Sequence, residues 1–254
     1  MLPGEPGALA APVATEPTRA VARVSIVIPV YNEQQLIREI VRRALDAPLP
    51  PGWEREVVIV DDGSDDGTTQ LLGQTRFPEN VRVFSSLINH GKGSALRAGF
   101  KLATGDIVLI QDGDLEYDPI ENYQRLLEPF ADPAVKVVYG SRFLERWYPE
   151  DMALANWSAN LLLTGLARLL FGVRITDEAT AFKVFRRELL DVLPLECRRF
   201  EFCPEFLAKV SKRGVRITEV PISYRGRNRL QGKKIRLSDG VQAVYTLLKW
   251  RLLP

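Results

Sequence analysis

Three acidic side chains that could bind a divalent cation occur close together near the middle of the chain. Asp112 and Asp114 flank a glycine, and Glu116 follows two residues later. The apolar run before them, Ile107–Ile110, is typical of a buried strand. At a strand's period of two, Asp112 and Asp114 leave its end on one side, so both can reach one cation. Such hard oxygen ligands suit Mg²⁺ or Mn²⁺ bridging a diphosphate. The alternative is a turn rich in Asp and Gly.

A second acidic run, at positions 61–67, follows an apolar run at 56–60. Acidic side chains there could accept hydrogen bonds from a base or a ribose, which favours Asp61 and Asp62 as ligand contacts. Ser64 is expected to cap the next helix. For Asp65 and Asp66, capping and turn chemistry is an equal alternative.

A glycine-rich segment at 89–93 is predicted to open a helix. Glycine allows close backbone approach, and a helix start with Lys92 beside it favours a bound anion. The spacing matches neither the dinucleotide fingerprint nor the phosphate loop of NTPases, which counts against a dehydrogenase or a kinase-like NTPase. His90 is the only histidine in the chain, and we interpret it as structural.

These polar sites follow apolar runs that read as buried strands. The runs lack polar alternation and are separated by segments with helical periodicity, which predicts an α/β fold: a mostly parallel sheet with helices on both faces. Sheets of this kind bind ligands at the carboxyl ends of their strands. The polar and glycine residues concentrate at five such ends, namely 29–33, 61–66, 86–93, 112–116 and 141–142.

The second half of the chain does not continue this alternation. From about Arg142 it offers an apolar helix at 157–171, a mixed segment at 176–187, a helix near 204–212, a strand at 215–224 and a final helix. We predict a single domain over 23–254. The residues before it, 1–22, are rich in Ala, Pro and Gly and are expected to form a flexible tail.

Composition narrows the class of protein. The 254 residues are 46% hydrophobic and 26% charged, enough to bury a core, and the net charge is only +2. The basic residues cluster, however: eight Lys or Arg and one acid lie between Arg225 and Arg251. This block favours phosphates or an anionic membrane surface, with a solvated helix face as the alternative.

The same composition predicts a cytoplasmic protein that binds no nucleic acid. Two cysteines cannot form a disulfide framework, so a reduced chain is expected. The first residues lack the features of a signal peptide, and no apolar run is long enough to form a transmembrane helix.

The order of these motifs resembles that of family-2 GT-A glycosyltransferases. The resemblance covers 23–251 and rests on 25–33, 61–68, 89–93, 112–114 and 140–142. Within that family the chain looks most like the polyprenyl-phosphate (dolichol-phosphate mannose synthase-like) branch. Supporting that branch are Thr176, Asp177, Thr180 and the segments 183–186, 219–221 and 227–234.

The resemblance implies a GT-A (Rossmann-like) fold and an inverting, metal-dependent reaction. A hexose would pass from GDP-mannose or UDP-glucose to a polyprenyl (dolichyl) phosphate, with Mg²⁺ or Mn²⁺ as cofactor. Residues 23–142 would form the nucleotide-sugar-binding half and 143–254 the acceptor-side half. The enzyme would work at the cytoplasmic face of a membrane, in contact with the membrane or with a membrane partner protein.

Roles carry over to this chain by position. Pro29, Tyr31, Glu33 and Asp62 would contact the nucleoside. Asp114 would bind the metal, with Asp112 near the sugar or diphosphate and Glu116 as a further ligand. Arg142 would meet the acceptor phosphate, and Arg229 with Lys233 or Lys234 would close over the diphosphate.

The chain also departs from the branch, mainly on the acceptor side. Asn156 and Trp157 stand where members usually carry an arginine, and Ala181 replaces a frequent glycine. Glu116 stands where glutamine is common, and the C-terminal membrane spans of many relatives are not present in this sequence.

A phosphate acceptor is compatible with the residues at hand. A phosphate monoester is already anionic, so it needs positive charge for docking rather than a general base. Arg142 and the basic block could supply this charge, while the metal stabilises the departing nucleoside diphosphate.

The final helix offers one apolar face beside basic and aromatic residues near its end. The face comprises Leu237, Val241, Val244, Tyr245, Leu248 and Leu252. Such a helix could lie in a membrane interface. The alternative is that this face packs on the domain or on a partner.

The second interpretation is a family-2 enzyme that acts on a saccharide hydroxyl in polysaccharide or cell-envelope assembly. It would need a general base, for which Asp177 or Glu205 are the candidates. An inactive nucleotide-sugar-binding relative is a third interpretation, and the intact Asp112 and Asp114 pair argues against it.

Overall fold

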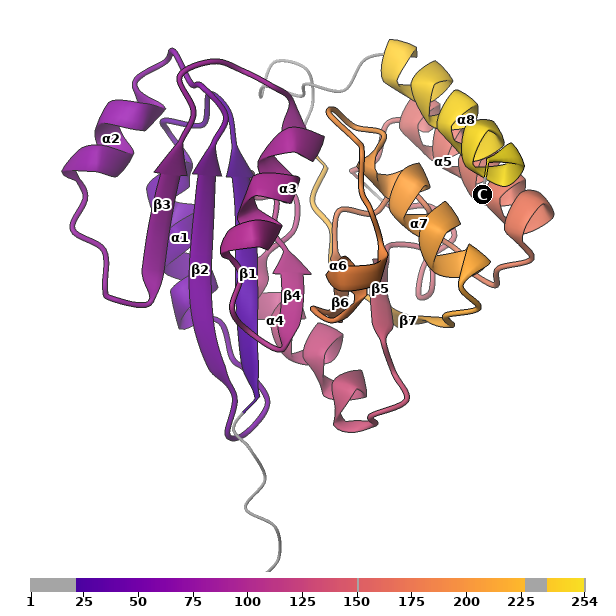
Figure 1. Ribbon diagram of the computed structural model, residues 1–254, viewed down its shortest axis with the longest axis horizontal. Coiled ribbons are helices and arrows are strands. Elements are labelled where there is room, and N and C mark those ends of the chain that lie inside the picture. Colours follow the sequence, from indigo (N-terminus) through magenta and orange to yellow (C-terminus); the bar gives the residue numbers. More distant parts are fainter. Residues whose placement is uncertain (1–21, 150, 227–236, 254) are drawn as a thin grey trace, which may run out of the picture.

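The computed structural model describes residues 22–149, 151–226 and 237–253 (Figure 1). Within these residues the strands form one sheet of seven, in the order β3-β2-β1-β4-β6-β5-β7. The strands are β1 (Arg23–Val30), β2 (Glu54–Asp61), β3 (Val81–Ser85), β4 (Ile107–Ile110), β5 (Val137–Ser141), β6 (Lys183–Arg186) and β7 (Ile217–Pro221).

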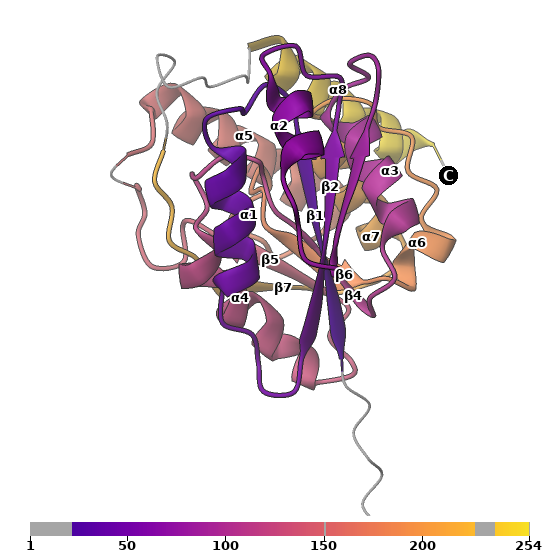
Figure 2. The ribbon, with the colours of Figure 1, turned by 90° about the vertical axis from the view of Figure 1, so that its left-hand side faces the viewer.

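Helices cover both faces of the sheet, as the sequence predicts (Figure 2). They are α1 (Ile37–Asp46), α2 (Thr68–Gln74), α3 (Lys92–Leu102), α4 (Pro119–Leu127), the 3₁₀ turn η1 (Glu128–Ala131), α5 (Leu154–Phe171), α6 (Leu189–Val192), α7 (Phe202–Lys212) and α8 (Leu237–Leu252). One core contains buried side chains of α1 and α4, and the other contains those of α3, α5, α7 and α8. Continuously apolar strands such as β1 pack into both cores because alternate side chains point to opposite faces.

The sheet is mostly parallel, with one strand reversed. β1 pairs in parallel with β2 and β4, and β5 pairs in parallel with β7. β6 lies between β4 and β5 and runs antiparallel to both. Its first residue, Lys183, is opposite Tyr139 of β5, so the segment that precedes β6 lies at the carboxyl ends of β4 and β5. The sequence indicated only a mixed segment here.

Two local expectations for helix starts have different outcomes. Asp118 caps α4 as predicted, since its carboxylate accepts a hydrogen bond from the Ile120 amide at 3.0 Å. Ser64 does not cap a helix. The helix begins later, at Thr68 after Gly67, and the Ser64 hydroxyl serves the preceding loop instead.

The last helix packs on the domain through a face different from the one predicted. α8 lies beside α5 and α7 (Figure 1), and it buries Ala243, Leu247 and Trp250. The described residues of the predicted apolar face are mostly exposed: Val241, Tyr245, Leu248 and Leu252. The alternative that this face packs on the domain is therefore wrong for these four side chains. None of the helices in the described part of the chain combines the length and apolarity needed to cross a membrane.

The close packing of α3 on the sheet predicts a stability difference between two helical glycines. A Cβ on Gly99 would lie 2.4 Å from Cγ1 of Val27, whereas one on Gly73 of α2 would meet no atom within 4 Å. Gly99→Ala should lower the free energy of unfolding by about 1–3 kcal/mol through overpacking. Gly73→Ala should raise it by up to about 1 kcal/mol through helix propensity. Urea titration of both variants tests this, and equal effects would contradict the packing of α3.

Candidate active site

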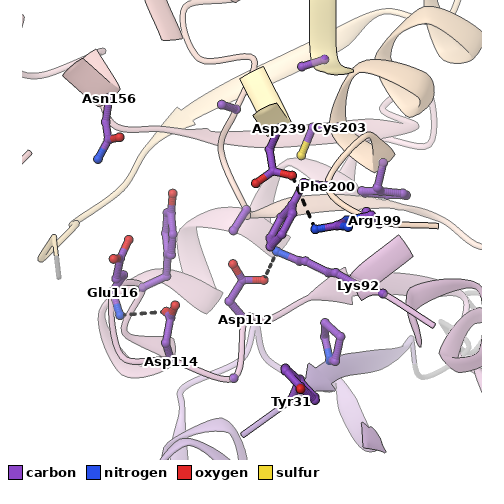
Figure 3. A pocket seen from close by; sticks show the side chains of 18 of the residues that line it. Tyr31, Lys92, Asp112, Asp114, Glu116, Asn156, Arg199, Phe200, Cys203 and Asp239 are labelled. Carbon is purple, nitrogen blue, oxygen red and sulfur yellow. Dashed lines mark hydrogen bonds and ion pairs between the residues drawn. The ribbon is translucent and has the colours of Figure 1, made fainter. Parts of the chain in front are cut away.

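A cavity of about 1380 Å³ opens at the carboxyl ends of β1, β2 and β4 (Figure 3). The residues predicted to bind substrate or metal that line it are Pro29, Tyr31, Glu33, Asp62, Lys92, Asp112, Asp114, Glu116 and Arg142. Asp61 does not line it. Arg229, Lys233 and Lys234 lie outside the described residues.

The loop after β1 is tied to the loop after β2. Asn32 has a positive φ of 52°, a conformation that asparagine tolerates better than most residues. Its side chain donates to the Asp65 carboxylate at 2.7 Å and accepts from the Asp65 amide at 2.9 Å. Asp65 therefore has a structural role, and its bonds to Asn32 hold the neighbouring Tyr31 and Glu33 at the rim of the cavity.

Asp61 acts inside its own loop. It is fully buried and accepts hydrogen bonds from the Ser64 hydroxyl and the Thr69 hydroxyl, each at 2.5 Å. The structure does not bring its carboxylate to the cavity, so of the two aspartates only Asp62 stands where the sequence expects a ligand contact.

The Asp62 carboxylate binds the start of α3. It accepts hydrogen bonds from the backbone amides of His90 at 2.9 Å and Gly91 at 2.7 Å. The start of α3 was predicted to favour a bound anion. In the structure this position is occupied by the carboxylate of Asp62. The segment before α7 also packs closely against Gly91, because a Cβ on Gly91 would lie 2.4 Å from the Arg198 carbonyl oxygen. Asp62 thus fixes the position of Lys92 in the next residue of the chain.

Lys92 pairs with the first aspartate of the acidic triplet. Its ammonium lies 2.5 Å from Asp112 Oδ1 (Figure 3). Burial by itself favours the neutral amine, but the negative charge of Asp112 raises the pKa of Lys92 above its ordinary value. The ion pair between Lys92 and Asp112 therefore places a positive charge beside the acidic turn after β4.

Asp114 and Glu116 belong to the turn that follows. The Glu116 amide donates to Asp114 Oδ1 at 3.1 Å. The Glu116 carboxylate neighbours Tyr224, and burial together with the charge and hydrogen bond of Glu116 raises the pKa of that phenol. Glu116 is therefore engaged with the wall of the cavity, whereas Asp112 and Asp114 follow β4 directly.

The donor set fits a divalent cation that is shared with a ligand. Among the described residues, no three His, Cys, Asp or Glu side chains come close enough to hold a metal by themselves. Mg²⁺ and similar ions are often bound by one or two carboxylates plus substrate phosphates. Asp112 and Asp114 meet that requirement, and Asp112 already has a cationic partner in Lys92.

Arg142 lines the cavity, but its charge is compensated. Its guanidinium donates two hydrogen bonds of 2.7 Å to the carboxylate of Asp177, which is fully buried. It also lies 5.2 Å from the ring centre of Tyr224. Despite burial, the charge of Asp177 keeps the pKa of Arg142 well above its ordinary value. A ligand phosphate at Arg142 would therefore compete with Asp177.

The two carboxylates considered as general bases are both engaged in ion pairs. Asp177 is bound to Arg142. Glu205 lies 2.6 Å from the Lys209 ammonium and accepts hydrogen bonds from the amides of Glu196 and Cys197. Glu205 is 1% exposed and is not among the residues that line the cavity.

Several cavity residues were not identified from the sequence. They come from α5, the segment before β6, the segment before α7 and the start of α8, and they include Asn160, Glu178, Arg199 and Asp239. The Arg199 guanidinium lies 4.0 Å from Asp239 (Figure 3). No motif marks these residues, because their proximity depends on how the second half of the chain packs on the sheet.

Glu178 differs from the other carboxylates in the cavity wall. It is 1% exposed, and its Oε1 has no hydrogen-bond partner among the described residues. Burial raises the pKa of Glu178 to about 7, with Lys183 and Arg142 opposing the shift and Asp177 adding to it. The sequence held no signal for this, since Glu178 simply follows Asp177 in the chain.

Comparisons with known proteins agree with the fold. The model of the family described as "Glycosyl transferase family 2" matches residues 25–193. The undecaprenyl-phosphate 4-deoxy-4-formamido-L-arabinose transferase of Pseudomonas fluorescens (strain SBW25) is 36% identical over 186 residues. That match covers 71% of this chain and 52% of the relative, so the chain spans about half the relative's length.

Solved structures share the architecture over nearly the whole chain. Glucosyl-3-phosphoglycerate synthase from Mycobacterium tuberculosis, in complex with UDP, superposes with a TM-score of 0.69 at 23% identity, covering 93% of this chain and 82% of the other. The same enzyme with Mn²⁺ and UDP-glucose has a TM-score of 0.69 at 22% identity, covering 93% and 81%. At this identity the likeness shows the GT-A fold.

The environment of Glu178 predicts a pH dependence of stability. Its folded-state pKa of about 7 is raised from 4.5, so its contribution is fully present below about pH 4.5 and is lost as the pH rises through about 7. Charged and titratable groups near it are Lys183, Arg142, Asp177 and Cys203. From pH 5 to 8, the wild type should therefore lose stability relative to Glu178→Gln in chemical denaturation.

The exposed Glu79 provides the matched control, since Glu79→Gln should follow the wild type at every pH. Parallel curves for the wild type and Glu178→Gln would show that the pKa of Glu178 is not raised.

Proposed function

The chain belongs to glycosyl transferase family 2, and from this we propose that it transfers a hexose, with inversion, from a nucleoside-diphosphate sugar to a polyprenyl phosphate. The proposal rests on one observation. Asp112, Asp114 and Lys92 meet at the end of β4 in a cavity with room for a sugar nucleotide. Residues 23–142 supply the donor side, and 143–254 supply the acceptor side.

On the donor side, four residues serve the nucleoside. The Tyr31 ring offers a surface for the base, next to Pro29 at the end of β1. Glu33 and Asp62 accept hydrogen bonds from ribose or base donors, and each carboxylate oxygen of Asp62 keeps a second lone pair beyond its backbone bond. GDP-mannose and UDP-glucose are the proposed donors. The complexes of the structural neighbours with UDP and UDP-glucose support a uridine donor through the fold.

At the diphosphate, Asp112 and Asp114 would hold Mg²⁺ or Mn²⁺, with Glu116 as a further ligand. When bound, the cation supplies positive charge to the leaving diphosphate. Lys92, whose ammonium is paired with Asp112 in this structure, would add a second positive charge beside the phosphates. The Mn²⁺ complexes of the structural neighbours support this assignment.

On the acceptor side, the nucleophile is a phosphate oxygen. It forms a bond to the anomeric carbon of the sugar as the bond to the diphosphate breaks, and the nucleoside diphosphate leaves. A phosphate monoester needs no general base, which agrees with Asp177 and Glu205 both being in ion pairs. The activity in the name of the 36% identical relative supports this acceptor.

Two arginines of the cavity are candidates to bind the acceptor phosphate. Arg142 remains a proposed ligand of the acceptor phosphate, for which the phosphate would compete with Asp177. Arg199 is more available, because its side chain is 64% exposed and its contact with Asp239 is 4.0 Å long. Arg229, Lys233 and Lys234 remain proposed for the diphosphate.

An apolar surface beside the cavity supports contact with a lipid. It is formed by α5 and α8, whose first turns line the cavity, and by the aromatic residues before α5. Its exposed side chains are Trp147, Tyr148, Leu154, Leu162, Leu169, Val241, Tyr245, Leu248 and Leu252. Because α5 carries no charged residue before Arg168, this surface suits lipid chains, with Trp147 and Tyr148 at the interface. We propose peripheral binding at the cytoplasmic face of a membrane.

A saccharide hydroxyl is the second candidate acceptor. It would need a general base, and Glu178 favours it because an unpartnered carboxylate oxygen with a pKa of about 7 stands in the cavity wall. The assay described next distinguishes the saccharide acceptor from the lipid acceptor.

The deciding measurement is nucleoside diphosphate release from GDP-mannose and UDP-glucose, with Mg²⁺ or Mn²⁺, with and without polyprenyl phosphate in vesicles. We expect release that requires both metal and lipid phosphate and is abolished by Asp114→Asn. Asp46→Asn, on the exposed face of α1, should be active. Slow metal-dependent hydrolysis indifferent to the lipid would contradict the lipid acceptor and favour the saccharide.

A test of the proposed role of Arg142 in acceptor binding requires a variant that leaves no buried charge unpaired. Arg142→Ala would strand the Asp177 carboxylate, at a cost of about 3–5 kcal/mol. The double variant Arg142→Gln, Asp177→Asn removes both charges and keeps the shape. It should raise the acceptor KM by much more than the donor KM. A larger rise in the donor KM would remove Arg142 from the acceptor site.

A further inference from the structure

Polar atoms without partners lie together where α5 meets the segment before β6. Among the described residues, Asn160 Nδ2, Glu178 Oε1 and Thr180 Oγ1 are buried and have no hydrogen-bond partner. Asn160 and Glu178 both line the cavity, and their exposed fractions are 3% and 1%. Buried polar groups in native proteins are nearly always paired, so the two atoms at the cavity, Asn160 Nδ2 and Glu178 Oε1, are open to a ligand.

Hydrogen bonds hold the Asn160 side chain and the Glu178 backbone in place. Asn160 Oδ1 accepts the Ala179 amide at 3.0 Å, which leaves the Nδ2 group of the same side chain as the free donor. The Glu178 amide donates to the Thr164 hydroxyl at 3.1 Å, and the Lys183 ammonium donates to the Glu178 carbonyl oxygen at 3.0 Å. The backbone at this place is therefore satisfied, and only the side-chain atoms are not.

Leaving such atoms unpaired costs stability, about 1–3 kcal/mol for each group. The packing around the Glu178 side chain does not require this cost, since an apolar side chain of similar size would fill its position. A cost of this kind at a cavity wall is typical of a binding position that is completed by a ligand.

The chemistry of the surrounding wall defines the ligand. The neighbours on α5 are Ala159 and Leu163, and those before β6 are Ala179 and Ala181. Of the nearby cations, Arg142 is paired with Asp177. The fully buried Lys183 ammonium donates to the Glu178 and Thr180 carbonyl oxygens and is not among the residues that line the cavity. The Glu178 carboxylate would also repel a phosphate. A hydroxyl group can donate to Glu178 Oε1 and accept from Asn160 Nδ2 at the same time.

We propose that Asn160 and Glu178 form a subsite that binds a hydroxyl group of the transferred sugar. The inference rests on the proposed function. A polyprenyl phosphate carries no carbon-bound hydroxyl, so in that reaction the hydroxyl belongs to the sugar of the donor. In the order of the sheet, the nucleoside side at β1 and β2 is followed by the carboxylates of β4 and then by the segment before β6. In a sugar nucleotide the sugar follows the diphosphate, so a donor bound along this direction would place its sugar near the segment before β6.

The test compares the binding of a sugar nucleotide with that of the nucleotide alone. Dissociation constants for UDP-glucose, GDP-mannose, UDP and GDP are measured by calorimetry on the full chain with Mn²⁺ and without acceptor. Glu178→Gln and Asn160→Asp each keep the shape, and Asn160→Asp also keeps an oxygen for the Ala179 amide. Each variant should weaken binding of the sugar nucleotide by about tenfold and leave that of the nucleoside diphosphate unchanged.

Ser158→Ala, at an exposed position of the same helix, is the matched control and should bind both ligands as the wild type does. Melting curves establish that each variant is folded. Unchanged sugar-nucleotide affinity in the folded variants, or an equal loss for both kinds of ligand, would overturn the subsite alone. Failure of the wild type to bind any of the four nucleotides would overturn the proposed function, and the subsite with it.

Discussion

The reversed strand β6 is the constraint on which the rest of the structure depends. In a purely parallel sheet, each connection is a crossover that returns the chain from the carboxyl ends of the strands to their amino ends. Because β6 runs antiparallel between β4 and β5, the segment that precedes it lies at their carboxyl ends. That segment carries Asp177 and Glu178, and it places the second half of the chain opposite the acidic turn after β4. The cavity exists because both halves meet at this edge.

Charge compensation is the second organising feature of the cavity. The Lys and Arg side chains that line it in the described ranges are Lys92, Arg142 and Arg199, and each stands next to a carboxylate. These pairs stabilise buried charges that would otherwise be costly. They also mean that an anionic substrate must exchange one partner for another. The exchange is easiest at Arg199, which is the most exposed of the three, and hardest at Arg142, which is buried in a bidentate pair.

The position of the apolar surface relates the cavity to its surroundings. α8 uses one face for the core and leaves another exposed, and the uncharged part of α5 lies beside it (Figure 1). The first turns of both helices line the cavity. A long apolar acceptor bound in the cavity could therefore extend onto this surface, which a small saccharide acceptor would not require.

The sequence by itself determined the α/β class, the mostly parallel sheet and the acidic turn after β4, because these depend on local periodicity and on polar residues at strand ends. It also identified most of the cavity wall at the ends of β1, β2 and β4, including Tyr31, Asp62 and Lys92. Tertiary structure decided the rest. The Asp61 carboxylate points into its own loop, Arg142 pairs with Asp177, and Asn160 accepts a hydrogen bond from the Ala179 amide, 19 positions later in the chain. Such pairings depend on the register of β6 and on how α5 packs, and no local pattern encodes them.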